Sequence, residues 1–257
     1  GHRHSSGHAR SRRPVARRLP PERYLADQGL EHFITRVFPV SMLSISTNFI
    51  ELIRLMSKKP AEILPNCRLF LMPPSGMAAD AVAASLSAAA EAGDVACLVL
   101  PPDKTLTDKL MPIAQEKDIA VLIVDDSRFA AYEKADGVHI TTAIEDAVAA
   151  HKALGRNASI GFVASGSRHA AMQAGETDID YIAFDVSSPD GVDLLTWWVP
   201  LFEVPCVALG AADEAACLEA IASGADFIMP PADLWNSPDE AAKLAGTLTK
   251  AGERNPA

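Results

Sequence analysis

The sequence predicts an α/β fold, a (β/α)8 barrel of the TIM type over residues 66–257, with an extra N-terminal segment before it. Eight short apolar runs rich in β-branched residues alternate with Ala-rich stretches of helical period. The runs are almost continuously apolar, as expected of parallel strands that are buried on both faces. Eight such units favour closure into a barrel, because an open flavodoxin-like sheet needs only about five or six strands.

Each predicted strand is followed by a predicted helix. The strands are expected at residues 67–72, 95–100, 119–124, 135–140, 158–163, 180–185, 205–209 and 225–229. The helices are expected at about 78–92, 105–117, 127–134, 143–154, 166–176, 190–202, 212–223 and 237–252. In a barrel of this type the active site lies where strands end and helices begin, so the loops after the strands are the candidates for chemistry.

The charge of the chain is divided unevenly. Residues 1–23 hold seven Arg and one acid, so this segment carries +6, and the remainder of a chain with net charge −10 carries −16. An acidic body repels phosphates, which argues against a nucleic-acid partner. Residues 1–23 are predicted to be a disordered basic leader that contacts RNA or an anionic surface, or else a solvated tail or expression remnant. Residues 24–65 form an N-terminal extension whose apolar spacing allows a helix.

The four cysteines predict neither a zinc site nor a disulfide framework, because none is paired at CxxC spacing. Cys67, Cys97 and Cys206 lie in or beside apolar strand runs, where Cys acts as a small hydrophobe. This usage is typical of a reducing cytoplasm. No apolar run approaches the about 18 residues that span a bilayer. We therefore expect a cytoplasmic protein with a small-molecule ligand, no membrane partner and the capacity to form a homo-oligomer.

Two adjacent carboxylates, Asp125 and Asp126, follow the third predicted strand and are the strongest candidates for a metal or for acid–base chemistry. Mg²⁺ takes one or two carboxylates together with substrate phosphates. Alternatively, one Asp caps the following helix while the other faces inward. Lys104, after the second strand, either holds a phosphate as a point charge or is a solvated Lys at a helix start.

Further candidates lie at the ends of other strands. His139 either reaches the mouth of the barrel or is a structural histidine, and Thr141 follows it. Gly210 ends the seventh strand, where a glycine lets backbone amides approach a phosphate. In the last loop Pro230 and Pro231 have no amide hydrogens, which removes two donors from the usual phosphate grip of such barrels.

Six short motifs occur in order along residues 66–250. They are Asp125-Asp126, Ala135-Asp136-Gly137-Val138-His139, Ile160-Gly161, Asp180-Tyr181-Ile182, Val207-Ala208-Leu209-Gly210 and Gly224-Ala225-Asp226. With this order and spacing the chain resembles the thiamine phosphate synthase/TenI superfamily, whose fold is a (β/α)8 barrel. The synthase of that superfamily joins a hydroxymethylpyrimidine diphosphate to a thiazole phosphate and releases pyrophosphate with Mg²⁺. The resemblance therefore implies a transferase of thiamine biosynthesis.

The resemblance assigns roles to several of the candidate residues. It carries Lys104 over as a phosphate ligand and Asp126 as a metal ligand, with Asp125 in the place of the family's Asn. Ser165 stands where the related thiazole tautomerase has a strand-5 His, and Gly210 keeps the first Gly of the seventh loop. Lys104, Ser165 and Gly210 are thus the expected substrate- or phosphate-binding residues, and Asp126 and Asp125 the expected metal ligands.

Other positions depart from the family pattern. The second metal-binding Asp is replaced by Ile144, and the strand-2 Gln and Arg by Leu100 and Pro102. The Thr-x-Thr-Lys loop after the sixth strand becomes the run 187–191, and the Ser-Ala-Ile phosphate grip becomes 230–232. The scaffold is retained while most anion-binding side chains are not.

Three functions stay open. The first is a thiamine phosphate synthase with a divergent site, and the second is a non-catalytic binding or regulatory barrel for a thiamine-related metabolite. The third is an enzyme acting on an uncharged or cationic substrate, which Asp125, Asp126, Asp185 and Asp190 suit better than arginines would. The sequence names no catalytic residue. Mg²⁺ is an expected cofactor only for the first function, and no organic cofactor is expected.

Overall fold

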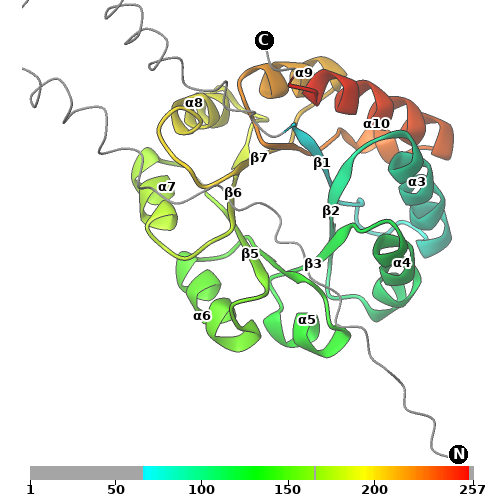
Figure 1. The fold of residues 1–257 in the computed structure, drawn as a ribbon, viewed down its shortest axis with the longest axis horizontal. Coiled ribbons are helices and arrows are strands. Elements are labelled where there is room, and N and C mark those ends of the chain that lie inside the picture. Colours follow the sequence, from blue (N-terminus) through cyan, green and yellow to red (C-terminus); the bar gives the residue numbers. More distant parts are fainter. Residues whose placement is uncertain (1–65, 165, 255–257) are drawn as a thin grey trace, which may run out of the picture. The chain divides into compact units, whose positions relative to one another are not determined.

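The computed structural model describes residues 66–164 and 166–254, and these form a closed barrel of parallel strands with helices around the outside (Figure 1). Each strand pairs with its neighbours in sequence, and β1 (Arg68–Leu71) pairs with β8 (Phe227–Ile228) to close the barrel. The predicted (β/α)8 fold is therefore confirmed. The predictions for residues 1–23 and 24–65 lie outside the described residues, as does Ser165.

Strands and helices alternate along the described chain. The other strands are β2 (Val95–Leu100), β3 (Ala120–Val124), β4 (Gly137–Ile140), β5 (Ser159–Val163), β6 (Tyr181–Asp185) and β7 (Cys206–Leu209). The helices are α3 (Ala79–Ala92), α4 (Lys104–Glu116), α5 (Ser127–Glu133), α6 (Ile144–Leu154), α7 (Arg168–Gly175), α8 (Pro189–Trp198), α9 (Glu214–Ala222) and α10 (Pro238–Gly252), with a 3-10 turn η2 (Ala232–Trp235) before the last.

Every predicted strand and helix is present, but several ends differ from the prediction. Helix α8 stops at Trp198, four residues before the predicted end at 202, because Pro200 has no amide hydrogen to continue the helix. Strand β8 has two residues, and Pro230 and Pro231 follow it closely. The turn η2 was not predicted. None of the described helices is both long enough and apolar enough to cross a membrane.

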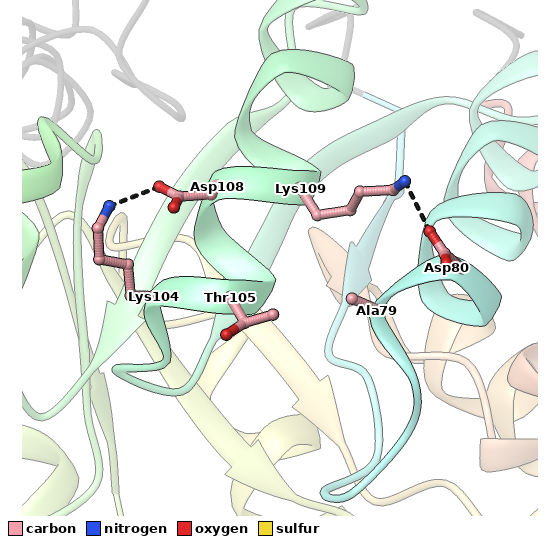
Figure 2. A pocket seen from close by; sticks show the side chains of 6 residues that line it. All are labelled: Ala79, Asp80, Lys104, Thr105, Asp108 and Lys109. Carbon is pink, nitrogen blue, oxygen red and sulfur yellow. Dashed lines mark hydrogen bonds and ion pairs between the residues drawn. The ribbon is translucent and has the colours of Figure 1, made fainter.

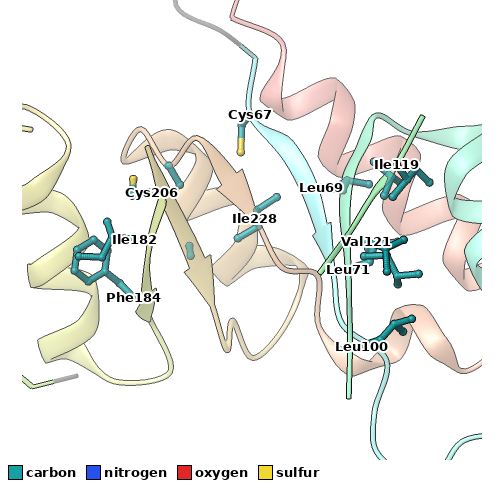
Figure 3. Close-up of a cluster of buried hydrophobic side chains, with 14 of the residues drawn as sticks. Cys67, Leu69, Leu71, Leu100, Ile119, Val121, Ile182, Phe184, Cys206 and Ile228 are labelled. Atoms are coloured by element: carbon teal, nitrogen blue, oxygen red, sulfur yellow. The ribbon is translucent and has the colours of Figure 1, made fainter. Parts of the chain in front are cut away.

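The hydrophobic core has two parts, one on each face of the sheet. The larger part lies between strands and helices, where side chains such as Leu69, Val121 and Phe184 face outward from the barrel (Figure 3). The smaller part fills the barrel interior and includes Phe70 and Tyr181. This arrangement explains why the strands read as continuous apolar runs, since both faces of each strand are buried.

The amino-terminal end of the barrel is held by aspartates that precede even-numbered strands. Asp136, Asp180 and Asp226 each accept a hydrogen bond, 2.8–2.9 Å long, from a backbone amide of the preceding odd-numbered strand. The amides belong to Val121, Ile160 and Cys206. The backbone amide of each aspartate also donates a hydrogen bond to the carbonyl of the residue whose amide its side chain accepts. Each Asp therefore joins two neighbouring strands. These contacts belong to the scaffold end of the barrel, opposite the functional mouth.

Candidate functional site

The floor of the mouth is apolar. Met72, Val124, Val163, Leu209 and Met229 lie at or just beyond the carboxyl ends of their strands and pack on the interior cluster. Leu209 is buried and the other four are partly buried. A ligand that enters the barrel from this end therefore meets aliphatic and thioether groups, which suit the face of an organic ring better than a phosphate.

His139 lies beneath this floor, inside the barrel. Its Nδ1 forms a hydrogen bond of 2.7 Å with the hydroxyl of Tyr181, and both side chains are fully buried. Its Nε2 has no hydrogen-bond partner among the described residues. Burial lowers the pKa of His139 to about 4, against a smaller opposing effect of the Asp125 carboxylate. The imidazole is therefore neutral near pH 7, and the pair packs as part of the interior.

Gly161 on β5 makes the His139–Tyr181 contact possible. A Cβ at this position would lie 1.8 Å from Tyr181 Cζ, so only glycine leaves room for the phenol ring against the strand. Gly161 pairs in register with both His139 and Tyr181, which brings the two side chains together across one strand. The sequence motif Ile160-Gly161 therefore has a packing role here.

Asp125 fastens the ends of β3 and β4 to each other. Its carboxylate accepts hydrogen bonds from the amide of Thr141, at 2.7 Å, and from the Thr141 hydroxyl. Its own amide donates to the carbonyl of His139. Asp125 also has φ +52°, in the left-handed region that Asp tolerates better than most residues. Both carboxylate oxygens are thus engaged within the protein, and Thr141 is the partner.

Asp126 acts as the N-cap of α5. Its Oδ1 accepts a hydrogen bond of 2.8 Å from the amide of Phe129. Of the two alternatives open for the acidic pair, the capping one is therefore seen at Asp126. Asp125 instead accepts hydrogen bonds from Thr141, so the two side chains of the pair have different partners.

Lys104 contacts the outer helices. Its ammonium lies 2.7 Å from Asp108 on the same helix and 3.4 Å from Glu133 at the end of α5. The hydrogen bond to Asp108 is the largest cause that raises its pKa. Lys104 lines a shallow groove of about 460 Å³ between the starts of α3 and α4, where Lys109 pairs with Asp80 (Figure 2). Each lysine in this groove already has a carboxylate partner.

Two arginines also follow strands. Arg128, in the first turn of α5, is exposed, whereas Arg168, at the start of α7, has a partner on α8. The guanidinium carbon of Arg168 lies 5.1 Å from the centre of the Trp197 ring, a cation–π contact between α7 and α8. Lys104 and Arg168 are therefore both held by groups of the surrounding helices.

Asp185 ends β6 on the interior side of the barrel. Tyr181 and Ala183, at alternate positions of the same strand, belong to the interior cluster, so Asp185 continues that face into the mouth. It is exposed, and its Oδ1 accepts a hydrogen bond of 2.9 Å from the Ser187 amide. Gly210, with φ +75°, lies directly against this carboxylate. From the sequence, Asp185 was expected to matter only for an uncharged or cationic substrate, together with Asp125, Asp126 and Asp190.

The contacts at the β3–β4 corner do not fit the two-carboxylate magnesium site that the family resemblance implies. Asp126 caps a helix, Asp125 is closed on Thr141, and Ile144 is an apolar residue that packs against the outer core. Among residues 66–164 and 166–254 no group of three or more His, Cys, Asp or Glu side chains is placed to hold a metal ion.

Comparison with known proteins adds evidence that the geometry alone does not give. The sequence pattern of the thiamine monophosphate synthase family (TMP-TENI) matches residues 74–230. The chain belongs to this family. It is 35% identical to the thiamine-phosphate synthase of Rhodospirillum centenum over 191 residues, which cover 68% of this chain and 92% of that protein. It is 34% identical to the thiamine-phosphate synthase of Hyphomonas neptunium, covering 70% of this chain and 90% of the relative.

Solved structures agree on the fold of this thiamine monophosphate synthase family member. The thiamine phosphate pyrophosphorylase of Pyrococcus furiosus superposes with a TM-score of 0.59 at 20% identity, covering 75% of this chain and 97% of that one. Orotidine 5'-phosphate decarboxylase of Pyrococcus horikoshii superposes with a TM-score of 0.55 at 14% identity, covering 71% and 99%. At such identities the likeness concerns the barrel alone.

Proposed function

We propose that this family member binds an uncharged or cationic heterocyclic ligand without phosphate groups at the carboxyl-end mouth of the barrel. The observation that carries the proposal is an apolar floor beside exposed carboxylates, while Lys104 is paired with carboxylates of the outer helices. The rings that the family resemblance implies, an aminopyrimidine and a thiazole, keep their aromatic faces and amino donors when they carry no phosphate.

The charge balance of the mouth supports this ligand class. Two phosphorylated ligands need several cationic or amide donors aimed at them, because a phosphate loses strong hydration when it enters a site. Lys104 and Arg168 are engaged by neighbouring groups, and Pro230 and Pro231 offer no amide hydrogens. Asp125 and Asp185 add negative charge at the same end of the barrel.

The mouth residues have clear tasks in such a complex. Met72, Val163 and Met229 contact the ring face and exclude water from it. Asp185 accepts a hydrogen bond from an amino group of the ligand or faces a cationic ring. The Asp125–Thr141 contact holds the β3–β4 rim in place while the ligand binds.

The standard synthase reaction is a second candidate, favoured by the 35% identity to a thiamine-phosphate synthase across 92% of that protein. For this reaction Lys104 has to leave Asp108 and Glu133 and turn toward a pyrophosphate group. Asp126 has to combine metal binding with its helix cap.

Isothermal titration calorimetry separates the two candidates. The unphosphorylated aminopyrimidine and thiazole alcohols and thiamine are titrated into the full chain, beside pyrophosphate with Mg²⁺. We expect micromolar binding of at least one unphosphorylated ring and none of pyrophosphate. Lys104→Ala is the matched variant: it leaves ring binding unchanged if the proposal is right, and it abolishes pyrophosphate binding if the synthase reaction is right. Tight pyrophosphate binding with no ring binding rejects the proposal.

A further inference from the structure

Asp185 stands at the corner between β6 and β7, at the carboxyl ends of these strands. Asp185 and Leu209 are paired in register at the ends of these strands, and Gly210 follows at once. The Asp185 side chain lies on the face of β6 that continues into the barrel interior. Whatever enters the mouth therefore meets this carboxylate at the rim of the apolar floor.

The carboxylate fills the space that the glycine leaves open. A Cβ added to Gly210 would lie 2.5 Å from Asp185 Oδ1, so any side chain there would displace the carboxylate. The positive φ of Gly210 adds a second reason for glycine at this turn. The close backbone approach that elsewhere accommodates a ligand phosphate is here used by an anion of the protein itself.

The same carboxylate occupies an amide donor of the rim. The Ser187 amide donates to Asp185 Oδ1 at 2.9 Å and so is not available to a ligand anion. Within the described part of the chain, no Lys, Arg or His forms an ion pair with Asp185. Its negative charge is therefore directed at the mouth without a protein counter-ion, and it opposes any anion that approaches Gly210.

We infer that Asp185 is the specificity-determining residue that excludes phosphate from the β6–β7 corner and selects an uncharged or cationic group there. This inference rests on the proposed function, because it names the residue that sets the ligand's charge. Asp185 acts by occupying the Gly210 surface and the Ser187 amide, and by its own charge. Replacing it should therefore open an anion site that the wild-type barrel lacks.

The test is a titration of the ¹⁵N-labelled full chain with inorganic phosphate. NMR monitors the chemical shifts of the Ser187 and Gly210 amides during the titration. We expect Asp185→Ala, which removes the charge and frees the amide, to bind phosphate about tenfold or more tightly than the wild type. Asp185→Asn keeps the size and an acceptor oxygen, so it should give a smaller gain. Asp193→Asn is the matched control, since it removes one exposed carboxylate from α8 and should give no gain.

Each outcome decides the inference. Equal phosphate affinity in the wild type and in Asp185→Ala overturns it, as does an equal gain of phosphate affinity in Asp193→Asn. If Asp185→Ala loses its native NMR spectrum, the Asp185→Asn titration decides alone, and no gain there is also a rejection. If the wild type binds a ring but the variants gain no phosphate affinity, only this inference is rejected. If the Asp185 variants gain phosphate affinity but the wild type binds no ring, the proposed function is rejected and the role of Asp185 in excluding phosphate is retained.

Discussion

The two ends of this barrel use aspartate in different ways. At the amino-terminal end Asp136, Asp180 and Asp226 reach across to the neighbouring strand and accept its amide hydrogen. They are buried or half-buried, and Asp226 is only 7% exposed. At the carboxyl end Asp125 and Asp185 are exposed. The first set joins strands of the scaffold, and the second lies exposed at the mouth.

The difference shows why the same residue type needs its partners before its role can be assigned. A buried carboxylate must be matched by donors, so its removal leaves an amide without a partner. An exposed carboxylate is hydrated, and its removal changes the local charge with little effect on folding.

Removing the most buried of the three amino-terminal-end aspartates should destabilise the protein strongly. Asp226→Ala removes the carboxylate that accepts hydrogen bonds from the amide and the thiol of Cys206. We expect the free energy of unfolding to fall by about 3 kcal/mol, measured by urea denaturation. Asp226→Asn keeps one acceptor oxygen and should recover part of the loss. The comparison between the ends fails if Asp185→Asn, at the mouth, costs as much as Asp226→Ala.

Acidification should destabilise the barrel through His139, which lies inside it near the mouth. Burial lowers the pKa of His139 in the folded chain to about 4, while in the unfolded chain its pKa is near the ordinary value of 6.5. Between these values the unfolded state binds the extra proton, so stability present above pH 6.5 is lost as the pH falls toward 4. The loss through this residue should be about 3 kcal/mol.

The measurement is urea denaturation of the wild type and of His139→Phe at several pH values between 7 and 4. His139→Phe cannot take up the proton, so its stability should fall less steeply with acidification, whatever its stability at pH 7. Parallel curves for the two proteins would mean that His139 is not held neutral by burial.

The fold could be predicted from the sequence because the patterns that indicate it are local and repeated. Continuous apolar strands such as 95–100 and Ala-rich helices such as 78–92 require a sheet that is covered on both faces, and eight units close it. The ends were harder to predict where prolines intervene, as at Pro200 and Pro230. Whether a proline ends a helix or strand depends on which hydrogen bond of that element its missing amide hydrogen would have made.

The site was less predictable because its side-chain contacts are not local in sequence. The motif order identified His139, Asp125 and Asp126, but nothing in a single sequence says that Asp125 bonds a residue 16 positions away or that Lys104 pairs with Glu133. Asp185 is the last residue of the strand predicted at 180–185, which is enough to place it near the mouth. Its contact with Gly210 required the register of β6 and β7.

The smallest expected effect concerns the contact between Asp125 and Thr141, which combines features of both ends. It joins two strands, as the amino-terminal aspartates do, but it lies exposed at the mouth. Thr141→Val keeps the shape of the side chain and the amide donor and removes only the hydroxyl, so unfolding should become easier by about 1 kcal/mol or less. Thr142→Val, which removes a hydroxyl bonded only to Asp146 on α6, is the control.

Ligand binding should separate the two variants more clearly than stability does. If the Asp125–Thr141 contact holds the rim of the apolar floor, ring binding measured by calorimetry weakens in Thr141→Val and stays at the wild-type value in Thr142→Val. Equal ring affinity in all three proteins would place this contact with the scaffold aspartates of the opposite end. The scaffold aspartates would then be defined by whether they join strands, and their exposure alone would not identify them.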